Sequence, residues 1–301
     1  MLKGIIAALI TPFRNEAIDF SALEKLLEFL IEKGIYGVFV SGTNGEGPLL
    51  LKEEKENLFK ETVRIVNKRI SVIAQIGEIS TKETILVGKK AVDAGVDAVA
   101  IVSPYYFKLD DNSLKTHFVK VAKALASTPV YLYNLPGSTG NIIKPELAKA
   151  IMDEANNVKG VKDSSKDLQV LEDFISILPS SSDVLVGTDS FIFPALAVGA
   201  KGAISALANP FPELCVGIYR DFLNQNFEGA KAKQLFLNRI RTITKQMSSI
   251  SSLKVLLRSR GIEVGDPRLP LGRVSSEQEE VLKGIIEEVE RTYSITMGGS
   301  L

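Results

Sequence analysis

The sequence predicts an α/β protein built as a (β/α)8 barrel, or TIM barrel, with a C-terminal helical extension. Three observations predict this fold. Short, apolar, β-branched runs alternate with longer amphipathic stretches. Several of the short runs are apolar on both faces, as buried parallel strands are. Eight such runs fit into roughly the first 205 residues, which is the spacing of a barrel.

The predicted strands are short. They are GIIAALI from Gly4, YGVFV from Tyr36, SVIAQI from Ser71, DAVAIV from Asp97, PVYLY from Pro129, VKGVK from Val158, DVLVG from Asp183 and GAIS from Gly202. An open, doubly wound sheet is the alternative. It is disfavoured because no G-x-G-x-x-G follows the first strand.

Helical patterns separate these strands and also follow the last of them. Between the strands they cover 20–33, 52–67, 81–94, 111–126, 144–155, 166–178 and 189–199, and after them 212–224, 228–248, 250–260 and 275–292. The phrases IEKGIYGVFV, VDAGVDAVAI and LAVGAKGAIS each place a glycine between a helix and a strand, as a repeated βα unit would. We therefore expect a catalytic barrel over 1–210 and a helical region, packed on it, over 211–301.

Composition narrows the functional classes. The 36 basic and 36 acidic residues balance, so the charge gives no reason to expect a nucleic acid or a membrane as partner. The single cysteine, Cys215, suits a reducing compartment, and we expect a cytoplasmic protein. With one histidine, His117, in a helical pattern, thiol–imidazole, Ser–His and zinc chemistry are disfavoured. We expect no metal site and no catalytic role for His117.

Catalytic residues of a barrel lie at the C-terminal ends of its strands. Those ends read SGTNGEG from Ser41, SPYY from Ser103, YLYNLPGSTG from Tyr131, Lys162, VGTDS from Val186 and SALAN from Ser205. They offer hydroxyls, phenols, amides and one lysine.

Strand alternation places Lys162 on the same face as Gly160 and Val158, and Lys159 on the other. If that face is the barrel interior, Gly160 leaves space for the long side chain, and burial lowers the pKa of the amine. A neutral amine attacks carbonyl carbons, which is the first step of Schiff-base catalysis. The alternative is a side chain that reaches the barrel mouth and pairs with Asp163.

A phenol on the neighbouring strand, Tyr133, can move protons, with Thr43 and Tyr106 available as a hydroxyl relay. The alternative for Tyr133 is a core residue with a satisfied hydroxyl. Backbone N–H groups of SGTNGEG can bind a carboxylate.

Four motifs, GTNGE, PYY, YNLPGSTG and GVKDSS, occur in order along the chain. Together they resemble the dihydrodipicolinate synthase/N-acetylneuraminate lyase family over nearly the whole chain. The resemblance implies a (β/α)8-barrel class I aldolase, usually a homotetramer, that binds pyruvate or another 2-keto acid as a Schiff base. The covalent imine would take the place of a cofactor.

The resemblance also implies roles for single residues. Lys162 would be the Schiff-base lysine, Tyr133 the proton shuttle and Thr43 its relay. Tyr106, or the adjacent Tyr105, would reach the relay of a neighbouring subunit. The pyruvate would be bound by the backbone N–H groups of Thr43 and Asn44 and by a contact with Ile204.

The chain departs from the family pattern at two positions. Asn44 replaces a hydroxyl residue, and Ser138 stands where dihydrodipicolinate synthases carry an arginine that binds the aldehyde's carboxylate. Serine cannot form that bidentate clamp, although it remains a candidate substrate contact. We therefore expect a lyase that makes or breaks a C–C bond between pyruvate and an aldehyde, with a 2-keto-3-deoxy sugar acid or a 4-hydroxy-2-oxoglutarate-type substrate. The alternatives are condensation of pyruvate with aspartate semialdehyde in lysine biosynthesis, which RLPL near the C-terminus favours, and a non-catalytic keto-acid-binding barrel.

Overall fold

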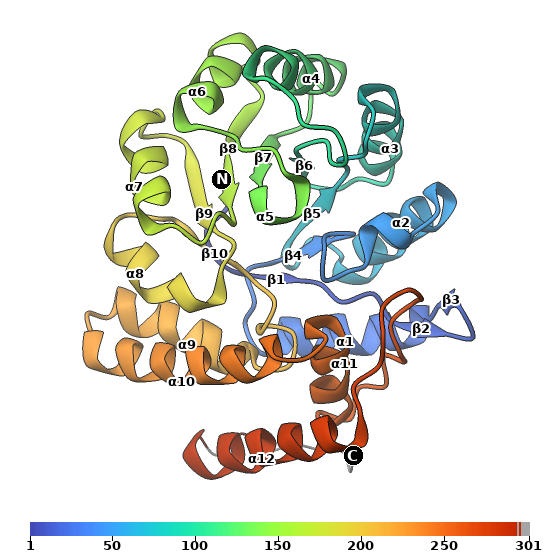
Figure 1. Ribbon diagram of the computed structural model, residues 1–301, viewed down its shortest axis with the longest axis vertical. Helices are drawn as coiled ribbons and strands as arrows, with labels where there is room; N and C mark the ends of the chain where they lie inside the picture. The colour runs from blue at the N-terminus through green and yellow to red at the C-terminus, as the bar shows by residue number, and fades with distance from the viewer. Residues whose placement is uncertain (294, 296–301) are drawn as a thin grey trace.

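The computed structural model describes residues 1–293 and 295 and has a closed parallel barrel at its centre (Figure 1). All eight predicted strands are present. They are β1 Gly4–Ala8, β4 Gly37–Val40, β5 Ser71–Gln75, β6 Ala98–Val102, β7 Val130–Asn134, β8 Val158–Asp163, β9 Asp183–Val186 and β10 Gly202–Ser205. Each strand pairs with the next in the chain, and β10 closes onto β1. The predicted (β/α)8 barrel is therefore confirmed.

The helices between the strands also follow the prediction. They are α1 Phe20–Glu32, α2 Lys52–Val66, α3 Thr81–Asp93, α4 Asp111–Ala124, α6 Pro145–Glu154, α7 Leu168–Ile177 and α8 Ile192–Ala197. Asp19, Ser80, Asp110 and Asp167 cap four of them through backbone N–H groups of the first turn. The sequence patterns missed only very short elements. These are the hairpin β2 Phe13–Arg14 and β3 Ala17–Ile18, the turn η1 Gly47–Leu49 and α5 Pro136–Thr139. The turn η2 Asp189–Phe191 lies within the helical pattern predicted for 189–199.

Strand β8 corrects part of the alternation argument. Lys162 and Gly160 share a face, but Val158 belongs to the outer hydrophobic core together with Val130. The pairing of β7 with β8 shifts between Val130 and Tyr131, so Lys159 is an extra residue that reverses the alternation. Val158 therefore points out of the barrel.

Gly160 does not leave space for the lysine either. An added Cβ there would lie 1.9 Å from the carbonyl oxygen of Asp183 on β9, so the glycine permits the close approach of two strands. At the bottom of the barrel, Asp183 accepts hydrogen bonds from the Tyr131 hydroxyl and from the Leu2 N–H.

Four helices follow the last strand: α9 Pro212–Leu223, α10 Phe227–Lys245, α11 Ser249–Arg258 and α12 Ser276–Tyr293. Helix α9 packs against β1 and α8, α10 lies along α9, and α11 contacts α10 and α12 (Figure 1). The division of the chain at residue 210 stays a prediction, and residues 294 and 296–301 of the predicted C-terminal region lie outside the described residues.

Among the described helices, none has the length and apolar content needed to cross a membrane. Within the same residues, no group of three or more His, Cys, Asp and Glu side chains could hold a metal ion.

Candidate active site

A cavity of about 360 Å³ lies at the C-terminal ends of the strands. Its lining includes five of the residues that the sequence singled out. They are Thr43, Asn44, Tyr133, Lys162 and Ile204. They come from β7, β8, β10 and the loop after β4, and only a closed barrel brings these segments to one point.

Lys162 is buried, with 4% of its surface exposed. Its Nζ lies 3.9 Å from the ring centroids of both Phe39 and Tyr133. Burial lowers the pKa of the amine, and the proximity of Tyr133 and Asp189 opposes that effect. This is the environment of a nucleophilic lysine.

The alternative pairing of Lys162 with Asp163 is not formed. The carboxylate of Asp163 accepts hydrogen bonds from Asn134 Nδ2 and from the Ser165 hydroxyl, both at 2.7 Å. Burial raises the pKa of Asp163. This carboxylate therefore joins the ends of β7 and β8 on the face away from the lysine.

Gly187, which sequence reasoning missed, makes room for the lysine. A Cβ at Gly187 would lie 3.0 Å from Cε of Lys162 and 2.0 Å from Oγ of Ser164. The position of Gly187 directly after β9, the strand that pairs with β8, is the sequence signal that could have identified it.

Tyr133 lies opposite Lys162 in the register of β7 and β8. Its hydroxyl is 3.5 Å from Oγ1 of Thr43, so the two hydroxyls are within hydrogen-bond distance inside one chain. Tyr106 does not join them: it is 86% exposed, has a φ of 81° and stacks edge-on against Phe107. Tyr105 is half-buried, and burial raises its pKa.

Ser138, a predicted substrate contact, and His117, for which no catalytic role was expected, lie away from the cavity lining. Ser138 is exposed on the short helix α5, and His117 is buried on α4, with Nδ1 2.9 Å from Oγ1 of Thr81. Burial lowers the pKa of His117 to about 4. Asn141, just after α5, holds the loop of Tyr106 through hydrogen bonds from Nδ2 to the carbonyls of Pro104 and Phe107.

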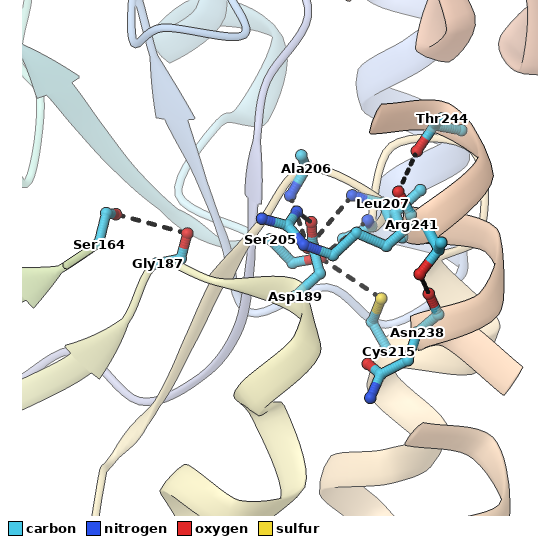
Figure 2. A network of polar contacts seen from close by, with 12 residues as sticks. Ser164, Gly187, Asp189, Ser205, Ala206, Leu207, Cys215, Asn238, Arg241 and Thr244 are labelled. Carbon is cyan, nitrogen blue, oxygen red and sulfur yellow. Dashed lines mark hydrogen bonds and ion pairs between the residues drawn. The ribbon is translucent and has the colours of Figure 1, made fainter. Parts of the chain in front are cut away.

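A polar network at the wall of the cavity, which the sequence did not predict, connects Asp189 with Ser205 and Arg241 (Figure 2). Asp189 accepts hydrogen bonds from the Ser205 hydroxyl at 2.6 Å and the Ala206 N–H at 3.0 Å, and its other oxygen pairs with Nη1 of Arg241 at 2.8 Å. Cys215 is buried beside Ser205, with its Sγ 3.5 Å from the hydroxyl, and burial raises the pKa of the thiol. Asp189 thereby connects β10 with α10.

Three cations line the same cavity: Lys166, Arg241 and Lys245. Burial lowers the pKa of Lys245, and Arg241 and Lys166 lower it further because like charges repel. In the part of the chain that the structure describes, no acidic side chain forms an ion pair with Lys166 or Lys245. The cavity therefore suits a ligand with a negative charge.

The fold and the cavity define a (β/α)8-barrel enzyme whose active site lies at the C-terminal ends of its strands. The sequence profile of the dihydrodipicolinate synthetase family matches residues 1–289. The chain belongs to this family and is a pyruvate-dependent class I aldolase, a carbon–carbon lyase.

Relatives are similar over almost their whole length. The chain is 34% identical, over 289 residues, to the 4-hydroxy-tetrahydrodipicolinate synthase of Methanocaldococcus jannaschii, covering 96% of this chain and 99% of the relative. The crystal structure of dihydrodipicolinate synthase from Aquifex aeolicus matches with a TM-score of 0.92 and 31% identity, over 99% of this chain and 100% of that one. The structure of YagE, a family member from E. coli K12 in complex with pyruvate, matches with a TM-score of 0.93 and 27% identity, over 96% of this chain and 99% of that one.

Proposed function

We propose that this aldolase joins pyruvate to an aldehyde that carries an anionic group, through an imine on Lys162. The neutral amine attacks the keto carbon, and the carbinolamine loses water to form the imine. The imine withdraws electrons from C3, so the enamine forms when C3 loses a proton, and it attacks the aldehyde carbon. Hydrolysis of the product imine restores the amine.

Tyr133 moves the protons in this scheme. Its hydroxyl would protonate the hydroxyl group of the carbinolamine, which then leaves as water, and the phenol would regain a proton through Thr43. The backbone N–H groups of Thr43 and Asn44 would hold the pyruvate carboxylate, with Ile204 against the substrate's apolar side.

The observation that carries the choice of aldehyde is a pair of lysines, Lys166 and Lys245, in the cavity that also holds Lys162. Neither forms an ion pair with an acidic side chain among the described residues, whereas Arg241 beside them is paired with Asp189. A product that extends from the buried amine toward Lys166 and Lys245 would place a negative charge against them. The relatives named 4-hydroxy-tetrahydrodipicolinate synthase support aspartate semialdehyde as this aldehyde. Dihydrodipicolinate synthase activity, rather than cleavage of a 2-keto-3-deoxy sugar acid, is therefore our first proposal.

Ser138 favours a second candidate, the cleavage of a 2-keto-3-deoxy sugar acid or a 4-hydroxy-2-oxoglutarate-type substrate. It leaves α5 without the arginine that clamps the aldehyde's carboxylate in the synthases. Of the aldehydes that these cleavages would release, glyoxylate carries a negative charge and would still contact the cationic side chains, whereas glyceraldehyde is neutral.

One substrate panel separates the candidates. The purified protein is assayed for condensation of pyruvate with aspartate semialdehyde, glyoxylate and glyceraldehyde, and for cleavage of 2-keto-3-deoxygluconate. The highest kcat/KM with aspartate semialdehyde supports the first proposal, whereas a preference for the neutral sugar would refute an anionic acceptor. Binding of pyruvate with no turnover of any aldehyde would indicate a non-catalytic barrel.

A homotetrameric assembly and a cytoplasmic location are also proposed for this protein. A homotetramer would allow Tyr106 to complete the relay of an adjacent subunit, since its hydroxyl is exposed in one chain. The single, unpaired Cys215 fits a cytoplasmic location.

A further inference from the structure

A buried ion pair joins the glycine loop after β4 to the C-terminal helix α11. Nζ of Lys254 lies 2.8 Å from Oε1 of Glu46, and the two side chains are only 2% and 0% exposed. The amine also donates to the carbonyls of Thr11 at 3.1 Å and Asp266 at 3.0 Å. The other carboxylate oxygen of Glu46 accepts from the Arg268 N–H at 2.8 Å. The pair thus ties three distant segments to the loop.

This arrangement is not explained by stability. Burial lowers the pKa of Lys254, and the proximity of Glu46 opposes that shift. The desolvation of two charges offsets most of their attraction, so buried pairs add little stability over apolar residues of the same size. A role in fixing geometry is the better-supported use of such a pair.

The backbone around Glu46 needs to be held in place. Its φ of 56° lies in the left-handed region, which residues with a side chain seldom adopt. Its N–H donates to the carbonyl of Thr43 at 3.1 Å, closing the turn that carries the N–H groups of Thr43 and Asn44. The Thr11 hydroxyl holds the carbonyl of Gly45 at 2.7 Å. A shift of Glu46 would therefore move these N–H groups.

Helix α11 reaches the cavity as well. Ser249 and Ile250, in its first turn, line the cavity, and Lys254 follows one turn later. The helix therefore contacts both the cavity and the loop that faces Lys162.

We propose that Lys254 and Glu46 are positioning residues that fix the carboxylate-binding turn of Thr43 and Asn44 at the right distance from Lys162. This inference rests on the proposed imine mechanism and on carboxylate binding by that turn. If the proposal holds, loss of the Lys254–Glu46 pair weakens imine formation between Lys162 and a keto acid. The reaction of Lys162 with a ketone that has no carboxylate is then unaffected.

Borohydride trapping measures both reactions on the same lysine. Wild type, Glu46→Gln, Lys254→Met and the double variant are incubated with increasing pyruvate or acetone, reduced, and the adduct on the Lys162 peptide is measured by mass spectrometry. We expect the half-saturating pyruvate concentration to rise about tenfold in each variant, equivalent to about 1.4 kcal/mol of binding. Trapping of acetone should change less than twofold.

Glu213→Gln is the matched control. Glu213 on α9 pairs with Arg260, just after α11, and lies outside the cavity lining. This variant should trap both ketones as wild type does. The double variant matters if a single variant does not fold, because it leaves no unpaired charge inside the protein.

Three outcomes would overturn the inference: unchanged capture of pyruvate, equal loss with pyruvate and acetone, or a double variant that does not fold. Failure of wild type to form any pyruvate adduct would instead refute the proposed function. The two hypotheses can therefore fail separately.

Discussion

The Nζ atom of Lys162 lies 3.9 Å from the centroid of the Tyr133 ring, and the two residues pair in register on adjacent strands. Phe39 covers the amine from another side at the same distance. Aromatic faces attract the ammonium form weakly, whereas loss of water disfavours it more strongly. The net effect is the lowered pKa of Lys162, and this has consequences for stability as well as for catalysis.

Lys162→Met should abolish the pyruvate adduct and raise stability at neutral pH. The folded-state pKa of Lys162 lies below the unfolded value of about 10.4, so between these two values only the unfolded chain binds the proton. Wild-type stability therefore rises with pH across that window, by at most about 1.4 kcal/mol per unit from this group. The advantage of Lys162→Met should be largest below the window and vanish above it.

Urea unfolding of both proteins at several pH values, from neutrality to above the unfolded pKa of about 10.4, checks this prediction. The exposed Lys159 on the same strand provides the control, since Lys159→Met should give a curve parallel to that of wild type. A constant difference between wild type and Lys162→Met would show that the amine is not perturbed by folding.

Tyr133→Phe should lower kcat by about 10²- to 10⁴-fold, the usual range for a lost acid–base group. Thr43→Val should lower it less, because the phenol remains. Since the two hydroxyls lie 3.5 Å apart and act in one relay, their effects should not multiply in the double variant. Steady-state kinetics of the four proteins test this, and fully multiplicative losses would mean that the hydroxyls act independently.

The sequence predicted the fold well because its signal is local and repeated. Every long strand and helix carries its own periodicity, whereas the two-residue strands β2 and β3 are too short to show one. Strand alternation correctly predicted that the side chain of Lys162 points into the barrel. The same argument wrongly predicted that Val158 does so too, because the pairing of β7 with β8 is irregular at Lys159. A single strand cannot reveal a shift that depends on its neighbour.

Site residues that belong to a sequence motif were predicted. Residues whose importance depends on tertiary contacts were missed. Arg241 faces Asp189 across 52 residues of sequence, and Gly187 matters only because of side chains on β8 and the residue after it. Neither contact leaves a local pattern. The cationic side of the cavity, which bears on the aldehyde, depends on such contacts.

Lys245→Met should raise the KM for an anionic aldehyde by about 10- to 100-fold, the range for one lost contact to a charged group. The reason is that Lys245 lies near Arg241 and Lys166 in the cavity, and among the described residues it forms no ion pair, although Asp189 partly offsets the repulsion from the two cations. Trapping of pyruvate should be unchanged, because the imine forms at the buried end. Lys231→Met, at an exposed site near the other end of α10, is the control.

High salt adds a second test of the same contact. It should raise the KM of wild type for the anionic aldehyde and have little effect on Lys245→Met. An equal rise in KM for glyceraldehyde in the variant would point to a change of shape rather than of charge.

Gly187→Ala and Gly160→Ala should separate catalysis from stability. At Gly187 the new methyl group meets mainly the side chains of Lys162 and Ser164, which can shift, and approaches the carbonyl oxygen of Asp163 only to 3.1 Å. The value of kcat should therefore fall at least tenfold, with a smaller loss of stability than at Gly160. At Gly160 the new methyl group meets the backbone of Asp183, so the free energy of unfolding should fall by about 1–3 kcal/mol or more. Urea unfolding and steady-state kinetics of both variants measure the two effects. Equal losses of stability would contradict this division.

Tyr106→Phe distinguishes a role within one chain from a role between chains. In a single chain Tyr106 is 86% exposed and its hydroxyl forms no hydrogen bond with the described residues, so its removal should have no effect on a monomeric enzyme. If the exposed pair Tyr106 and Phe107 enters an adjacent subunit, kcat should fall by about tenfold or more. Tyr105→Phe should then be near wild type.

Sedimentation of wild type and Tyr106→Phe at equal concentration tests whether the substitution changes the oligomeric state. Both proteins should form the same oligomer, because the phenylalanine ring keeps the apolar contact and lacks only the hydroxyl. A loss of turnover with unchanged assembly assigns the hydroxyl to chemistry across the interface. Full activity of Tyr106→Phe in an intact oligomer would leave the relay with Tyr133 and Thr43 alone.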